Sequence, residues 1–159
     1  MADSNDFVKW GKRYLTNIPL IDEQHQELIR ITNELYRECR KGSAIARSSY
    51  KNTLKDIVDY VVIHFSTEEK MMEIVKYPEL MAHKNQHEGF VKKILEDTKN
   101  FQEGKTFVPN VFVRYLRDWI FSHIAIEDKH YADYIFSLKK QGLLEGVFSS
   151  SKARRRAAD

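Results

Sequence analysis

Five histidines and one glutamate occupy positions that the hydrophobic pattern of this chain assigns to the protein interior. They recur among apolar residues at steps of three and four: His25, His64, Glu68, His83, His87 and His123. A buried imidazole or carboxylate without a partner costs about 1 to 3 kcal/mol. One interior histidine is usually satisfied by a single hydrogen bond, but a cluster of five needs a common partner. A metal ion is such a partner.

The spacing of these residues suits metal binding. His64 and Glu68 are four residues apart, and so are His83 and His87. Side chains at this spacing share one face of an α-helix, about 6 Å apart along its axis, and can converge on one ion. Imidazoles and a carboxylate without a thiolate favour iron, zinc, manganese or copper over an iron–sulfur cluster.

The carboxylate that accompanies His123 is ambiguous from spacing alone. On an ideal helix Glu127 lies about 40° around the axis from His123, whereas Asp128 lies about 140° away. Simple periodicity therefore favours Glu127. However, Asp128 shares an apolar stripe with Ile124 and Tyr131, which indicates that it also faces inward.

Prolines and glycines mark the elements that must position these residues. A proline opens each of three long periodic segments, and a glycine follows the end of three segments. We expect an all-α, up-down-up-down antiparallel four-helix bundle, because the linkers are short and no strand-like alternation competes. The prolines are Pro19, Pro78 and Pro109, and the glycines are Gly42, Gly104 and Gly142. The expected helices are 18–41, 47–76, 79–103 and 109–141; the expected organisation is an N-terminal arm (1–17), the bundle (18–141) and a basic tail (142–159).

Composition excludes several classes of protein. The 159 residues include 42% hydrophobic residues, which is enough for one globular domain with a core. No apolar run approaches the roughly 18 residues needed to span a bilayer, and we expect residues 1–12 not to act as a secretory signal. The excess of three positive charges lies in the tail, so no nucleic-acid surface is expected. A single cysteine, Cys39, favours a reducing, cytoplasmic location.

The residues around the metal-ligating candidates resemble those of the hemerythrins, in particular their bacterial branch, the bacteriohemerythrins. The resemblance extends from about Trp10 to Leu138, and its ligand pattern selects Asp128 over Glu127. The matching segments are IDEQHQEL (21–28), HFSTEEKMM (64–72), YPELMAHKNQHEGF (77–90) and WIFSHIAIEDKHY (119–131).

This resemblance implies a non-haem di-iron centre with a bridging oxo or hydroxo group. His83, His87 and His123 would hold one iron, and His25 and His64 the other. The two bridging carboxylates would be Glu68 and Asp128. This set leaves one of twelve octahedral positions vacant, on the two-histidine iron, where O2 is expected to bind. The resemblance also implies an apolar O2 pocket lined by Leu28, Phe65, Trp119, Ile120 and Ile124.

Reversible O2 binding, for storage or for delivery to oxygen-consuming enzymes, is the expected function. Ferritin-like di-iron enzymes carry about four carboxylates, whereas five neutral imidazoles favour the lower oxidation state of iron. Two alternatives remain: a di-iron enzyme acting on peroxide, nitric oxide or O2, and an oxygen or redox sensor that works through a partner. An oxygen-consuming enzyme or a reductase is a possible partner. His130 is expected at the surface or behind a ligand.

Overall fold

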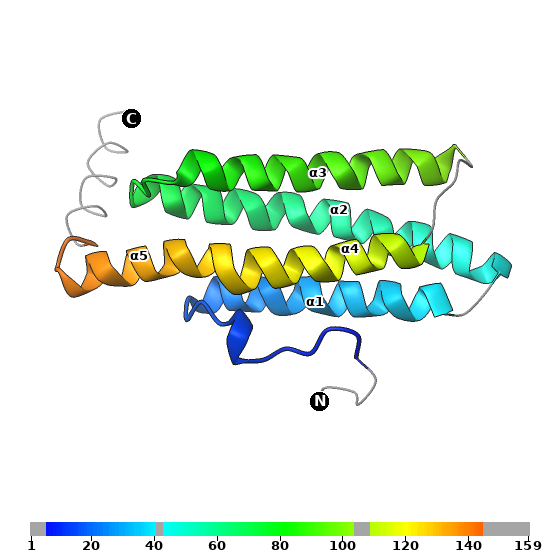
Figure 1. Ribbon diagram of the computed structural model, residues 1–159, viewed down its shortest axis with the longest axis horizontal. Coiled ribbons are helices and arrows are strands. Elements are labelled where there is room, and N and C mark those ends of the chain that lie inside the picture. Colours follow the sequence, from blue (N-terminus) through cyan, green and yellow to red (C-terminus); the bar gives the residue numbers. More distant parts are fainter. Residues whose placement is uncertain (1–5, 41–42, 104–108, 145–159) are drawn as a thin grey trace, which may run out of the picture.

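The computed structural model describes residues 6–40, 43–103 and 109–144, with the side chains of 43–50 and 109 excepted. Every regular element in these ranges is helical (Figure 1). The elements are η1 (Lys12–Tyr14), α1 (Pro19–Arg40), α2 (Ser43–Ile74), α3 (Leu80–Gln102), α4 (Pro109–Ser122), the π-helical segment η2 (His123–Glu127) and α5 (Asp128–Lys140).

The helices form the predicted four-helix bundle. In Figure 1 successive helices run in opposite directions, and α4, η2 and α5 continue one another as a single rod. α1 packs against α2 and α4, and α2 packs against α3. No helix within the described ranges combines the length and the apolar character needed to span a bilayer.

Two of the helix ends show how local backbone conformation sets the boundaries. Gly142 lies just past the end of α5, as predicted, and adopts a left-handed conformation (φ 70°) there. α2 ends at Ile74 rather than at the predicted residue 76, because Lys76 takes the same conformation (φ 54°) and Tyr77 N–H donates to the Met72 carbonyl. Gly42 and Gly104 lie outside the described residues.

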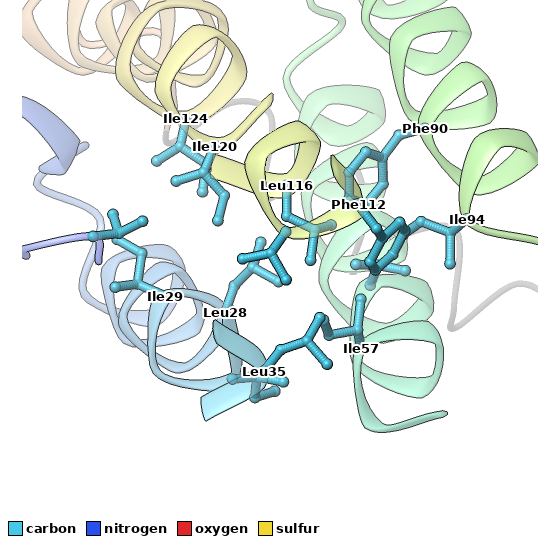
Figure 2. Close-up of a cluster of buried hydrophobic side chains, with 14 of the residues drawn as sticks. Leu28, Ile29, Leu35, Ile57, Phe90, Ile94, Phe112, Leu116, Ile120 and Ile124 are labelled. Carbon is cyan, nitrogen blue, oxygen red and sulfur yellow. The ribbon is translucent and has the colours of Figure 1, made fainter. Parts of the chain in front are cut away.

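Two groups of buried apolar side chains fill the bundle. The larger group includes Leu28 from α1, Ile57 from α2, Phe90 from α3 and Leu116 from α4, whose side chains point toward one another in Figure 2. The smaller group contains Met72, Tyr131 and Ala132. Along α2 the larger group ends at Phe65 and the smaller begins at Met72, so residues between them lie between two apolar layers.

The N-terminal arm is fastened to α1 by two buried polar side chains. Asn33 accepts a hydrogen bond from Val8 N–H (2.8 Å) and donates one to the Val8 carbonyl (2.9 Å). Asp22 accepts hydrogen bonds from the backbone N–H groups of Thr16 (2.7 Å) and Asn17 (3.1 Å). These hydrogen bonds hold the arm against α1, next to which Figure 1 shows it as the dark blue segment.

We expect Asn33→Ala to lower the free energy of unfolding by about 1 to 3 kcal/mol, because it removes both contacts and leaves the buried Val8 N–H unsatisfied. Urea denaturation measures this change. Asn85→Ala is the matched control, since Asn85 is exposed in α3 and the substitution makes the same change in helix propensity. Equal stabilities of the two variants would show that Asn33 does not hold the arm.

Candidate metal centre

The seven residues selected from the sequence meet inside the bundle. Each of α1, α2, α3 and the rod formed by α4, η2 and α5, which we call the fourth rod, contributes at least one of them. No residue of the set is more than 4% exposed. α1 contributes His25; α2 contributes His64 and Glu68; α3 contributes His83 and His87; the fourth rod contributes His123 from η2 and Asp128 from α5.

The ligand atoms of this cluster form two overlapping groups, each suited to one ion. Within each group one ligand atom per residue lies within 4.8 Å of every other. The three-histidine group contains Glu68, His83, His87 and His123, and the two-histidine group contains His25, His64, Glu68 and Asp128.

Both carboxylates extend between the two groups. Glu68 Oε1 lies 3.6 Å from His25 Nε2, while its Oε2 lies 3.3 Å from His87 Nε2. Asp128 Oδ2 lies 3.1 Å from His25 Nε2, while its Oδ1 lies 3.2 Å from His123 Nε2. Asp128 therefore presents one oxygen to each side of the cluster. Glu68 also lies between the two groups, although its Oε2 is 3.7 Å from His64 Nε2 as well, so both carboxylates are placed where a bridging ligand would lie.

Several of these buried atoms have no hydrogen-bond partner, although polar atoms inside proteins are normally paired. They are the Nε2 atoms of His25, His64 and His83, Oε2 of Glu68 and both carboxylate oxygens of Asp128. Metal coordination would satisfy all of them at once. The donor set therefore fits two metal ions with nitrogen and oxygen ligands.

The π-helical segment η2 decides which carboxylate of the fourth rod faces inward. Asp128 N–H donates to the carbonyl of His123, five residues earlier, so the wider turn brings residues at this spacing onto one face. Asp128 is fully buried, whereas the Glu127 side chain is 35% exposed and pairs with His130 at 3.8 Å. The preference of simple periodicity for Glu127 is therefore wrong, and His130 lies at the surface.

Hydrogen bonds on the far side of three histidine rings orient them. Nδ1 of His64 lies 3.0 Å from Gln24 Oε1, and Nδ1 of His123 lies 2.8 Å from Gln86 Oε1. An oxygen acceptor at this distance places the ring proton on Nδ1. Nε2 then carries the lone pair that can bind a metal. For His123 this atom lies 3.0 Å from Nε2 of His87.

His87 is the third histidine whose Nδ1 meets an oxygen acceptor. This atom lies 3.0 Å from Glu69 Oε1. The sequence pattern predicts none of these acceptors. Each is the immediate neighbour of a cluster residue on its own helix but serves a histidine on another helix. Because periodicity describes only one helix at a time, a polar residue adjacent to a ligand is the only signal of this role that the sequence offers.

Tyr131 supports Glu68 from the smaller apolar group. Its hydroxyl donates a 2.7 Å hydrogen bond to Glu68 Oε1, and its ring is fully buried. Burial and the neighbouring Glu68 carboxylate raise the pKa of Tyr131 well above its usual value, so the hydroxyl keeps its proton and remains a donor.

The charges of the cluster suit a cation. Burial and the neighbouring carboxylate act to raise the pKa of Asp128, but His123 and His25 lower it to about 2. Burial lowers the pKa of His64 to about 4, which keeps its imidazole neutral. Burial also acts to lower the pKa of His25, but the adjacent carboxylates of Asp128 and Glu68 raise it to about 9. A metal bound here would take the place of the proton on His25 beside the two carboxylates.

The expected O2-pocket residues all lie in or against the larger apolar group, but two of them contact the three-histidine side. The ring of Phe65 stacks on His87 with centroids 3.7 Å apart, and Trp119 stacks on His123 at 4.2 Å. Leu28, Ile120 and Ile124 are buried in the larger group, with at most 1% exposure.

Comparison with known proteins agrees with this geometry. The family model described as the hemerythrin HHE cation binding domain matches residues 16–135. The chain belongs to the hemerythrin family. A bacteriohemerythrin of Methylococcus capsulatus is 34% identical over 116 residues, which cover 73% of this chain and 86% of the relative. A bacteriohemerythrin of Stenotrophomonas maltophilia is 32% identical over 126 residues, covering 79% and 80%.

Solved structures extend the similarity to three dimensions. A crystal structure of wild-type hemerythrin is 31% identical to this hemerythrin-family chain and superposes with a TM-score of 0.74. The match covers 80% of this chain and 96% of the other. A hemerythrin mutant in which a leucine is replaced by tyrosine matches with a TM-score of 0.75. The described bundle is therefore the hemerythrin fold.

Proposed function

We propose that this chain binds O2 reversibly at a di-iron centre held by the seven clustered residues. The observation that carries the proposal is the pair of histidine groups joined by two buried carboxylates, three of whose four oxygen atoms lack a hydrogen-bond partner. The match to a cation-binding family model and the similarity to bacteriohemerythrins support it. Iron is the metal that the family name implies.

The residues divide into distinct roles in this proposal. His83, His87 and His123 would hold one iron, His25 and His64 the other, and Glu68 and Asp128 would bridge them. When bound, the two ferrous ions supply the electrons for reversible O2 binding. We assign O2 to the side of His25 and His64, because that side has one imidazole fewer.

The surrounding side chains would keep the centre dry. Leu28, Ile120 and Ile124 are buried and offer no proton to a bound ligand. Water or a proton near bound O2 would favour its release as peroxide, so these residues would line the O2 pocket and protect reversibility. A protein with this property stores O2 or delivers it to oxygen-consuming enzymes, and a reductase partner would restore its ferrous form. We propose a carrier rather than an enzyme.

An optical titration with O2 tests this proposal. The iron-loaded protein is expected to contain two irons per chain, to be colourless when reduced, and to gain charge-transfer bands with O2 that fade when O2 is removed. The zinc-loaded protein is the control and should show no such bands. One zinc per purified chain, or bands that never fade, would contradict the carrier function.

A further inference from the structure

The three acceptors behind the histidine rings differ in charge. His64 and His123 meet the neutral amides of Gln24 and Gln86, but His87 meets the carboxylate of Glu69. On the two-histidine side, Nδ1 of His25 has no hydrogen-bond partner. Among these ring contacts, a negative charge therefore lies behind a histidine only on the three-histidine side.

Glu69 is placed so that its charge reaches His87 with limited screening. Its side chain is 24% exposed, while that of His87 is 2% exposed and is stacked on Phe65. The other oxygen of Glu69 lies 3.4 Å from Lys84 Nζ, which also pairs with Glu73 at 3.0 Å. Lys84, whose side chain is 27% exposed, thus partly offsets the charge of Glu69.

A carboxylate that accepts from Nδ1–H changes the histidine as a metal ligand. The charge-assisted bond is roughly twice as strong as the corresponding bond to a neutral amide. It fixes the ring and raises the basicity of Nε2, while the added negative charge favours a more positive metal. The carboxylate of Glu69 therefore favours the ferric state on the three-histidine side more than on the two-histidine side.

We propose that Glu69 is a positioning residue for His87 that makes the three-histidine side the more easily oxidised side of the di-iron centre. Lys84 moderates this effect from the surface. The inference rests on the proposed function, since it concerns the same centre. It adds a charge asymmetry that the ligand set itself does not contain.

Opposite shifts of the reduction potential test this inference. Glu69→Gln keeps an acceptor for Nδ1 but removes the charge, so the potential of the iron-loaded protein should rise. Lys84→Gln removes the offsetting charge, so the potential should fall. We expect Glu69→Gln to change the ferric-to-ferrous ratio at a fixed potential at least tenfold, which is about 59 mV for a one-electron step. Spectroelectrochemical titration measures both shifts.

Glu88→Gln is the matched control, because it removes the same charge from an exposed residue next to His87 in the sequence. Solvent and salt screen that charge, so the potential should move much less. In zinc-loaded protein, Glu69→Gln should also shift the Nδ1 nitrogen-15 resonance of His87 and leave those of His64 and His123 in place.

The outcomes separate this inference from the proposed function. A wild-type protein that binds no iron would overturn the di-iron proposal itself. A wild-type protein that binds iron and O2, with no potential shift in Glu69→Gln or with the same sign of shift in both variants, would overturn only the role of Glu69. If Glu69→Gln fails to load iron, Lys84→Gln decides: a lower potential supports the inference, and an unchanged or higher one refutes it.

Discussion

Replacing Asp128 with alanine is expected to reduce the iron content from two per chain to less than one and to abolish the reversible oxygenated spectrum. The substitution removes one negative charge and both oxygens that face His25 and His123. Metal analysis and an O2 titration of the purified variant measure the two effects.

Glu127→Ala is the matched control for Asp128→Ala, because both remove a carboxylate from neighbouring positions on the same rod. Glu127 is partly exposed and contacts the surface residue His130. This variant should therefore keep two irons and the wild-type spectrum. The reverse result, with iron lost from Glu127→Ala and kept by Asp128→Ala, would mean that the inward carboxylate had been misassigned.

The five histidines are expected to fall into two classes when each is replaced with alanine. His25→Ala and His64→Ala weaken the side that we assign to O2, so O2 binding should fail while some metal remains on the other side. Changes at His83, His87 or His123 should instead release the whole centre, because the proposed three-histidine iron is the more heavily ligated. Iron content and O2 binding, measured on the same samples, separate the classes.

His130→Ala is the control for this series, because the sixth histidine is 56% exposed and pairs only with Glu127 among the contacts in the described structure. It should retain two irons and bind O2 normally. Identical losses of metal and O2 binding in all five interior variants would refute the unequal roles of the two sides.

The helices and most of the inward-facing residues could be predicted from the sequence alone. The pairs His64 with Glu68 and His83 with His87 are four residues apart, and this spacing places both members on one face of any regular α-helix. Their positions among apolar residues then direct that face to the core. Both properties are local, because helix period and burial pattern are set by residues close together in the chain.

The carboxylate that accompanies His123 is identified on physical grounds only in the folded structure. The angle from His123 favoured Glu127 because it assumes an unbroken α-helix. The apolar stripe around Asp128 argued for Asp128 instead, so spacing alone left the choice open until the resemblance selected Asp128. The π-helical turn supplies the physical reason, since its hydrogen bonds reach back five residues instead of four. Asp128 then meets His25 from another helix, a contact that no local pattern contains.

The acceptors behind the histidine rings were likewise decided only by packing. Gln24, Glu69 and Gln86 each reach a histidine on a neighbouring helix, so their roles depend on how two helices are aligned. A one-dimensional pattern places residues around a single axis and carries no information on the register between axes. The interior positions of the ligands therefore follow from the sequence. The orientation of the histidine rings, and the difference in charge between the acceptors behind them, follow from the assembled bundle.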